Sequence, residues 1–212
     1  MNNEQMLNNQ VYLSGTICSE PVFSHEVLGE GFYETSLKVK RLSDQYDEIP
    51  LTISERMLTE ENSKIGTRMT VSGQFRSYNK IDDGKSKLIL RVFVREILED
   101  DDEKNPNTIE IVGFVCKQPI YRTTPFKREI SDMLIAVNRA YNKSDYIPCI
   151  AWGRNARYAQ TFNVGEKVRI LGRIQSREYN KAHEDGSVEK KIAYEVSVGQ
   201  ISIYENDDKE LS

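Results

Sequence analysis

The sequence predicts a mainly β protein that contains two copies of one small barrel in tandem. Three observations support this prediction. A segment near the N-terminus recurs about one domain length later, apolar residues alternate with polar ones over much of the chain, and each copy has one short segment with helical spacing. The 212 residues are enough for two small domains, since domains most often hold about 100–150 residues.

The repeat is clearest near the start of each copy. Residues 11–23 match residues 109–121 without a gap, at an offset of 98 (109 − 11), and a glycine, a cysteine and a proline coincide. Further along the chain the match slips by single residues in loops, which places Tyr78 opposite Tyr179. A repeat of this length indicates two units of the same fold.

Charge and composition predict the domain boundaries. Residues 99–107 form an acidic run with a proline, which cannot bury apolar surface and is typical of a solvated linker. We therefore expect an N-terminal domain over residues 9–98 and a C-terminal domain over residues 108–204. Residues 205–212 form a short acidic tail.

Apolar residues recur at every second position in several segments, which is typical of half-buried strands. Leu37 and Val39 show this pattern in the first copy, and Ile135 in the second copy lies in a similar segment. Gly15 and Gly113 interrupt two such segments. A glycine inside a strand suggests a bulge or a sharp bend of the kind that curls a sheet into a barrel.

Each copy has one helical candidate, Glu55–Asn62 in the first and Asn155–Phe162 in the second. Asp82-Asp83-Gly84 and Glu184-Asp185-Gly186 have the chemistry of turns and mark the tips of two hairpins. Each copy then has five strands, with the helix between the third and the fourth. This is the layout of the OB-fold, a small five-stranded Greek-key barrel.

Composition argues against several classes of protein. No apolar run reaches the roughly 18 residues that a membrane span needs, and the N-terminus lacks the basic and apolar regions of a secretory signal. We therefore expect a cytoplasmic protein that contacts no membrane. The three cysteines are widely spaced and outside any Cys-x-x-Cys motif, so we expect neither a disulfide framework nor a zinc ribbon.

No motif in the sequence indicates catalysis. There is no phosphate-binding Gly-x-x-x-x-Gly-Lys loop, no Gly-x-Ser-x-Gly elbow and no His-Glu-x-x-His helix. The only histidines, His25 and His183, are not near a second metal-ligand candidate. We therefore predict that the protein is not an enzyme and uses no metal and no cofactor.

The net charge of −4 conceals a difference between the two copies. Residues 109–204 hold 15 Lys and Arg against 10 Asp and Glu, a net of +5, whereas residues 11–98 hold 12 against 13, a net of −1. Proteins hold single-stranded nucleic acid in a basic groove with aromatic side chains, and each stacked base contributes about 1–3 kcal/mol. The second copy has both features.

Three segments of the second copy resemble a known family. Residues 133–139, 145–153 and 165–179 are together similar to the bacterial single-stranded DNA-binding protein, and the likeness extends over about residues 107–204. The resemblance implies sequence-tolerant binding of single-stranded DNA in replication, recombination or repair. The first copy shares only the general pattern of these segments. The resemblance therefore supports the same fold for the first copy more strongly than the same function.

The resemblance also implies which residues contact DNA. Bases would stack on four aromatic side chains, Tyr141, Tyr146, Trp152 and Tyr179. Phosphates would be contacted by five basic side chains, Arg139, Arg154, Arg173, Arg177 and Lys181. For Trp152 a partly buried position in the core is an equal alternative, because tryptophan is often largely buried.

The first copy lacks most of these aromatic residues. Trp152 corresponds to Ser54, Tyr146 to Glu48 and Tyr141 to Ser43, and only Tyr179 has an aromatic counterpart. We therefore expect the first domain to be a scaffold or a weak binder. Its contribution would be a weak extension of the groove at Arg76, Tyr78 and Lys80.

Two further expectations concern partners. Members of the family typically work as tetramers of single OB-folds, so a homodimer of this chain would present four barrels. The acidic tail lacks the aromatic end by which the family recruits replication and repair proteins, although such partners stay possible. The alternative function is an OB-fold protein-interaction module of a replication or restart assembly, with weak nucleic-acid binding.

Overall fold

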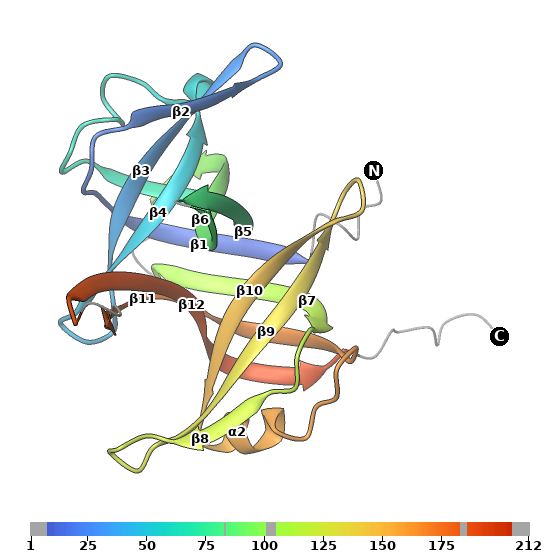
Figure 1. The fold of residues 1–212 in the computed structure, drawn as a ribbon. Coiled ribbons are helices and arrows are strands. Elements are labelled where there is room, and N and C mark those ends of the chain that lie inside the picture. The colour runs from blue at the N-terminus through green and yellow to red at the C-terminus, as the bar shows by residue number, and fades with distance from the viewer. Residues whose placement is uncertain (1–7, 83, 101–104, 183–185, 205–212) are drawn as a thin grey trace.

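The computed structural model describes residues 8–82, 84–100, 105–182 and 186–204, and its strands form two OB-folds (Figure 1). The first barrel contains β1 (Asn9–Ile17), β2 (Val22–Val27), β3 (Glu30–Lys40), β4 (Tyr46–Ser54), η1 (Glu55–Met57), β5 (Arg68–Asp82) and β6 (Lys85–Leu98). The second contains β7 (Asn107–Val115), β8 (Ile120–Thr123), β9 (Glu129–Arg139), β10 (Lys143–Trp152), α2 (Arg154–Ala159), β11 (Lys167–Ala182) and β12 (Val188–Ile203).

Five strands close each barrel. In the first barrel β1 pairs with β5 and, at its end, with β3, and the circuit continues through β4 and β6 back to β5. The second barrel repeats this circuit with β7, β9, β10, β12 and β11. The predicted OB-folds are therefore confirmed. β2 and β8 are additional strands, which pair with the outer parts of β3 and β9 and which the sequence did not predict.

Gly15 and Gly113 allow the barrels to close. Each lies where the first strand of its barrel passes from one neighbouring strand to the other. A Cβ atom at Gly15 would lie 2.6 Å from the carbonyl oxygen of Lys38, and one at Gly113 would lie 2.5 Å from that of Ala136. The predicted sharp bend is therefore present, while the register shifts of the barrel strands lie elsewhere, at Gly73 and Gly172.

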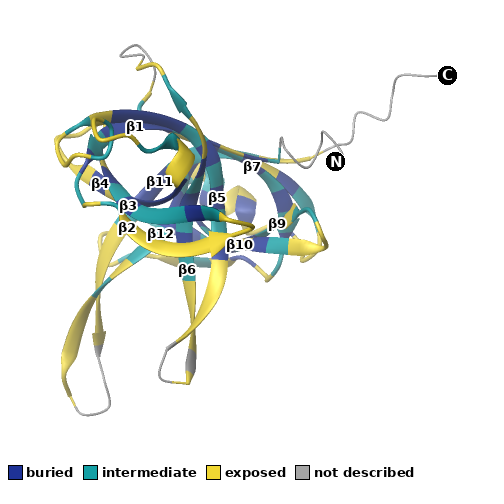
Figure 2. Cartoon of the chain, turned by 90° about the horizontal axis from the view of Figure 1, so that it is seen from above, coloured by how far each residue is buried: buried dark blue, intermediate teal, exposed yellow. Residues whose placement is uncertain are grey.

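The interior of the barrels follows the alternation seen in the sequence. Leu37, Val39 and Ile135 are fully buried, as the period-two pattern predicts. The buried apolar side chains of the two barrels form one contiguous cluster. Figure 2 shows that the buried residues lie within the barrels. It also shows two long, mostly exposed hairpins that project from the same side of the molecule.

The two barrels are joined edge to edge by their first strands. β1 and β7 pair antiparallel from Asn9 opposite Ile111 to Leu13 opposite Asn107, so that all twelve strands belong to one sheet. Within each barrel, an asparagine at an equivalent position of the repeat ties the joining strand to its neighbour. Asn9 hydrogen-bonds both the backbone N–H and the carbonyl of Phe75, and Asn107 does the same with Ile174.

The helices are shorter than predicted, above all in the first copy. α2 covers most of Asn155–Phe162, but the first copy has only the three-residue η1 in place of Glu55–Asn62. After η1, the side chains of Thr59 and Asn62 each accept a hydrogen bond from the other residue's backbone N–H. Such local side-chain bonds favour a turn over a continued helix.

The linker begins as part of the first barrel. The carboxylate of Asp100 accepts hydrogen bonds of 2.8 Å from Ser14 and Thr70. Residues 101–104 of the linker and the tail 205–212 lie outside the described residues. No helix in the described part of the chain has the length and the apolar character that crossing a membrane requires.

Candidate nucleic-acid interface

The outer face of β10 carries two of the predicted stacking residues. Tyr146 and Trp152 are 44% and 37% exposed, while Ile147, Cys149 and Ala151 on the opposite face of the strand are buried in the core. Because side chains alternate along a strand, the buried residues place Tyr146 and Trp152 on the same outer face. Trp152 is therefore partly exposed on the outer face of β10 and not enclosed in the core.

Trp152 lies at the end of β10, beside residues of two neighbouring strands. It is directly opposite Ile130 on β9, and Ile130 is opposite Arg122 on β8, so the three side chains form one cross-strand row. Arg122 also forms an ion pair of 2.7 Å with Asp132. The sequence did not single out Arg122, because it lies on a strand that the sequence did not predict.

Tyr141 lies at the tip of the hairpin between β9 and β10. Its side chain is 86% exposed, and its backbone has a positive φ of 61°, as does that of Asn142 at 53°. Two successive residues with positive φ form the tight turn that reverses the chain. The turn presents Tyr141 to solvent, where a base could stack on it.

The hairpin strand β11 carries a second group of predicted residues. Arg177, Tyr179 and Lys181 are exposed and lie on one face of the strand, because they are spaced two residues apart. Tyr179 is 39% exposed, and the Arg177 guanidinium lies 5.9 Å from the centre of its ring. Arg177 also forms an ion pair of 3.5 Å with Glu195.

The other predicted phosphate ligands have different surroundings. Arg154 is exposed at the start of α2. Arg173 is partly buried and forms an ion pair of 3.1 Å with Asp47 of the first barrel, and burial lowers the pKa of its guanidinium. Arg139 lies 3.5 Å from the buried carboxylate of Asp145. Arg139 and Arg173 are therefore located at the junction of the barrels rather than on the open face.

The structure brings the predicted extension in the first barrel next to the stacking face of the second. The Ser77 hydroxyl accepts a hydrogen bond of 2.7 Å from the backbone N–H of Tyr146. Tyr78 and Lys80, which follow Ser77 on β5, are exposed. The hairpin of the first barrel thus lies along β10 of the second barrel.

The strand register corrects one correspondence between the copies. Counted from the register shifts at Gly73 and Gly172, Tyr78 is five residues along its hairpin and Tyr179 is seven. The structural counterpart of Tyr78 is therefore Arg177. The Tyr-Asn-Lys triplet occurs in both copies, so aligning the two sequences places Tyr78 opposite Tyr179. The hydrogen-bonded register of the strands instead aligns Tyr78 with Arg177.

The first barrel has aromatic residues that the sequence comparison missed. Phe93 on β6 and Phe32 on β3 pack with their ring centres 5.7 Å apart, and both are partly exposed. The Arg76 guanidinium lies 4.3 Å from the centre of the Phe93 ring. Phe93 could have been found by alternation, because it lies between the buried Val92 and Val94 and must therefore point outward.

Burial and charge shift the pKa of two groups at the junction. Burial lowers the pKa of Arg76 to about 10, and the positive charges of Arg95 and Arg139 act in the same direction. Burial raises the pKa of Asp145, against the hydrogen bond from Ser77 and the charge of Arg139. Among the described residues, no group of three His, Cys, Asp or Glu side chains could hold a metal ion.

The sequence of this chain is similar to those of known proteins. The single-strand binding protein family matches residues 106–204. Single-stranded DNA-binding protein B of Bacillus subtilis (strain 168) is 30% identical over 87 residues, which are 38% of this chain and 75% of the relative. The chain belongs to the single-strand binding protein family.

Other members of the single-strand binding protein family match over a smaller share of their length. Single-stranded DNA-binding protein 2 of Listeria innocua serovar 6a is 29% identical over 106 residues, 47% of this chain and 64% of the relative. Protein 1 of Staphylococcus aureus (strain COL) is 32% identical over 80 residues, 34% of this chain and 48% of the relative. The chain therefore spans between about half and two thirds of the length of these relatives.

One solved structure of a single-stranded DNA binding protein matches nearly the whole chain. The wild-type protein from Thermus aquaticus superposes with a TM-score of 0.69, at 19% identity, and the match covers 96% of both chains. A likeness at this identity shows the fold alone. It extends the comparison to the first barrel, which the family match does not reach.

Proposed function

We propose that this member of the single-strand binding protein family binds single-stranded DNA without sequence preference and without catalysis. The observation that carries the proposal is the outer face of β10, where Tyr146 and Trp152 are exposed on the same side of one strand. A base has an aromatic face whatever its identity, so stacking on such residues tolerates any sequence. Tyr141 and Tyr179 would extend the stacking surface on the two adjoining hairpins.

Phosphate contacts would come from the exposed basic residues of the second barrel. Arg154, Arg177 and Lys181 are exposed and near the proposed stacking residues in the chain. Arg139 and Arg173 already contact buried carboxylates, so we assign them a smaller part on this face. The net charge of +5 over residues 109–204 supports the proposal, because a positive surface attracts the phosphate backbone.

The second barrel would be the principal binding domain, and the first would contribute a weak extension. The stacking positions of the second barrel correspond to Ser43, Glu48 and Ser54 in the first. The extension at Arg76, Tyr78 and Lys80 is supported by the hydrogen bond that ties Ser77 to Tyr146. The biological setting that we propose is replication, recombination or repair.

Tryptophan fluorescence tests this function directly, because the sequence contains a single tryptophan. Stacking of a base on Trp152 should quench its emission when poly(dT) is added. Affinity should also fall with salt, with a slope of about −0.7 in log K against log [salt] for each phosphate neutralised. Absence of both quenching and a gel shift at low salt would overturn the proposal. A parallel titration with poly(U) measures any preference for DNA over RNA.

A second candidate function rests on the edge strand β2. All six residues of β2 are exposed, including Val22, Phe23 and Val27, and one edge of the strand has no partner among the described strands. An open strand edge with apolar side chains can pair with another chain. This feature favours a protein-interaction module in a replication or restart assembly, and we would prefer that function if the fluorescence and gel-shift tests both fail.

The same edge supports a homodimer, which would present four OB-folds. Most homo-oligomers use one surface twice around a two-fold axis, and β2 offers such a surface. Sedimentation equilibrium of the full chain, with and without oligo(dT), tests the assembly. A mass of one chain at all concentrations would exclude the dimer and leave the DNA-binding proposal intact.

A further inference from the structure

Two pockets lie at the junction of the barrels, and the repeat relates them to each other. One is lined by Arg41, Asn107 and Arg173. The residues at the equivalent positions, Arg139, Asn9 and Gln74, line the other. The pockets are therefore two versions of one feature, and the differences between them come from substitutions between the copies.

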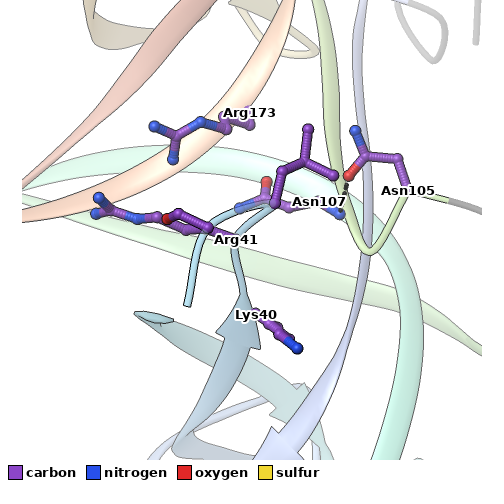
Figure 3. A pocket seen from close by; sticks show the side chains of 7 residues that line it. Lys40, Arg41, Asn105, Asn107 and Arg173 are labelled. Carbon is purple, nitrogen blue, oxygen red and sulfur yellow. Dashed lines mark hydrogen bonds between the residues drawn. The ribbon is translucent and has the colours of Figure 1, made fainter. Parts of the chain in front are cut away.

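In the first pocket both arginines are paired with the same carboxylate. Its volume is about 200 Å³. Arg41 and Arg173, from the two barrels, point in the same direction with their guanidinium groups side by side, while Lys40 points away from them (Figure 3). Both guanidinium groups bind the buried carboxylate of Asp47, at 2.6 Å and 3.1 Å. Both arginines that line this pocket therefore have a carboxylate partner within the protein.

The second pocket is larger and has more cationic side chains around its single carboxylate. Its volume is about 540 Å³, within the roughly 300–1,000 Å³ of typical ligand sites. Four cationic side chains line it, Arg76 and Arg95 from the first barrel and Arg139 and Lys143 from the second. The only carboxylate in its lining is Asp145.

One exchange of residue type leaves the carboxylate of the second pocket with fewer charged partners. Arg173, which binds Asp47 in the first pocket, is replaced by Gln74 in the second, and an amide cannot neutralise a carboxylate. Asp145 is left with Arg139 at 3.5 Å, and its Oδ2 atom has no hydrogen-bond partner.

Arg76 and Arg95 are held together by neutral groups. Both donate hydrogen bonds to the amide oxygen of Gln74, at 2.8 Å and 3.2 Å, and both lie over the ring of Phe93. None of the ion pairs between described residues includes either arginine, and the Nε atom of Arg76 has no hydrogen-bond partner. Burial and, to a smaller extent, the positive charge of Arg95 lower the pKa of Arg76. Two adjacent guanidinium groups of this kind match the oxygens of a phosphate.

We propose that this second pocket binds a backbone phosphate of single-stranded DNA where the strand crosses from the second barrel to the first. The inference rests on the proposed DNA-binding function and specifies the path of the bound DNA strand across the protein. Tyr141 lines the pocket on the side of the second barrel. On the side of the first barrel the Arg76 and Arg95 guanidinium groups lead to the rings of Phe93 and Phe32. A strand held here would pass from one aromatic surface to the other.

The test compares a short and a long oligonucleotide on the full chain. One OB-fold covers about 4–16 nucleotides, so oligo(dT) of about 8 nucleotides can occupy one barrel and about 30 nucleotides can reach both. Arg95→Ala should weaken binding of the long oligonucleotide about fivefold at roughly 0.1 M salt and flatten its salt slope by about 0.7, the effect of one phosphate contact. Arg95 is exposed, so the substitution should leave the fold intact. Binding of the short oligonucleotide should not change.

Lys40→Ala is the matched control, because Lys40 is an exposed cation that lines the other pocket, in which both arginines are paired with Asp47. It should leave both affinities within about twofold of the wild type, a change of about 0.4 kcal/mol. Equal effects of the two substitutions on the long oligonucleotide would overturn the proposed path. If the wild-type chain binds neither oligonucleotide, the DNA-binding function itself fails, and the two failures are therefore distinguishable.

Discussion

The backbone N–H of Ser77 in the first barrel donates a hydrogen bond of 2.7 Å to Oδ1 of the buried Asp145 in the second. The repeat produces the mirror relationship, in which the N–H of Ser176 donates to Asp47 at 2.8 Å. Each barrel therefore places one buried carboxylate against the hairpin of the other. These paired contacts fix the position of β5 along β10 and of β11 along β4, which in turn sets the path available to a bound strand.

The two buried aspartates should differ in their contribution to stability. Asp47→Asn leaves Arg41 and Arg173 without their charged partner, and breaking a buried ion pair in this way costs about 3–5 kcal/mol. Asp145→Asn keeps an oxygen that can accept from Ser77 and loses only the ion pair with Arg139, so it should stay within about 1 kcal/mol of the wild type. Urea unfolding of both variants measures the difference, and equal losses would contradict it.

Trp152 should contribute to DNA affinity through its ring. Trp152→Ala is expected to weaken binding of oligo(dT) by about 1–3 kcal/mol, whereas Trp152→Phe keeps an aromatic face and should lose less. Phe23→Ala is a suitable control, because Phe23 is an exposed aromatic residue on the edge strand β2. Fluorescence anisotropy of a labelled oligonucleotide gives the affinities. A loss as large for Phe23→Ala as for Trp152→Ala would count against a specific stacking role.

The two hairpin tyrosines, Tyr179 and Tyr78, should contribute unequally to DNA affinity. Tyr179→Ala is expected to cost about 1–3 kcal/mol of DNA affinity, because Tyr179 belongs to the proposed principal surface. Tyr78→Ala should change the affinity little, since the first barrel contributes a weak extension. Isothermal titration with oligo(dT) compares the two variants under the same salt concentration. Comparable losses at both positions would show that the barrels share the binding more evenly than we propose.

Closure of the second barrel should depend on Gly113. Gly113→Ala would place a Cβ atom 2.5 Å from the carbonyl oxygen of Ala136, which forces the backbone to shift and should cost about 1–3 kcal/mol of folding free energy. Gly199→Ala serves as the control, because its Cβ would lie 3.4 Å from the nearest atom, at ordinary contact distance. Thermal unfolding of the two variants tests this. Equal melting temperatures would mean that the barrel can relax around the added methyl group.

Local patterns were sufficient for the fold and for part of the site. Alternation along β10 depends only on neighbouring residues, so the sequence could place Ile147 and Cys149 inside and Tyr146 outside. The same rule applied to β6 would have identified Phe93. The helix prediction for Glu55–Asn62 was wrong over most of its length. The hydrogen bonds between the side chains and backbone N–H groups of Thr59 and Asn62 stabilise a turn there in place of a helix.

By itself the sequence determined the repeated OB-fold, the outward side of β10 and the basic character of the second copy, because periodicity and charge are local properties of the chain. Only the tertiary structure decided that Arg173 is bound to Asp47, 126 positions away, while Arg76 and Arg95 have no carboxylate partner among the described ion pairs. The sequence alone does not show which charged residues contact each other across the junction of the barrels. That pairing arises when β1 and β7 join the barrels and bring each hairpin against the opposite copy.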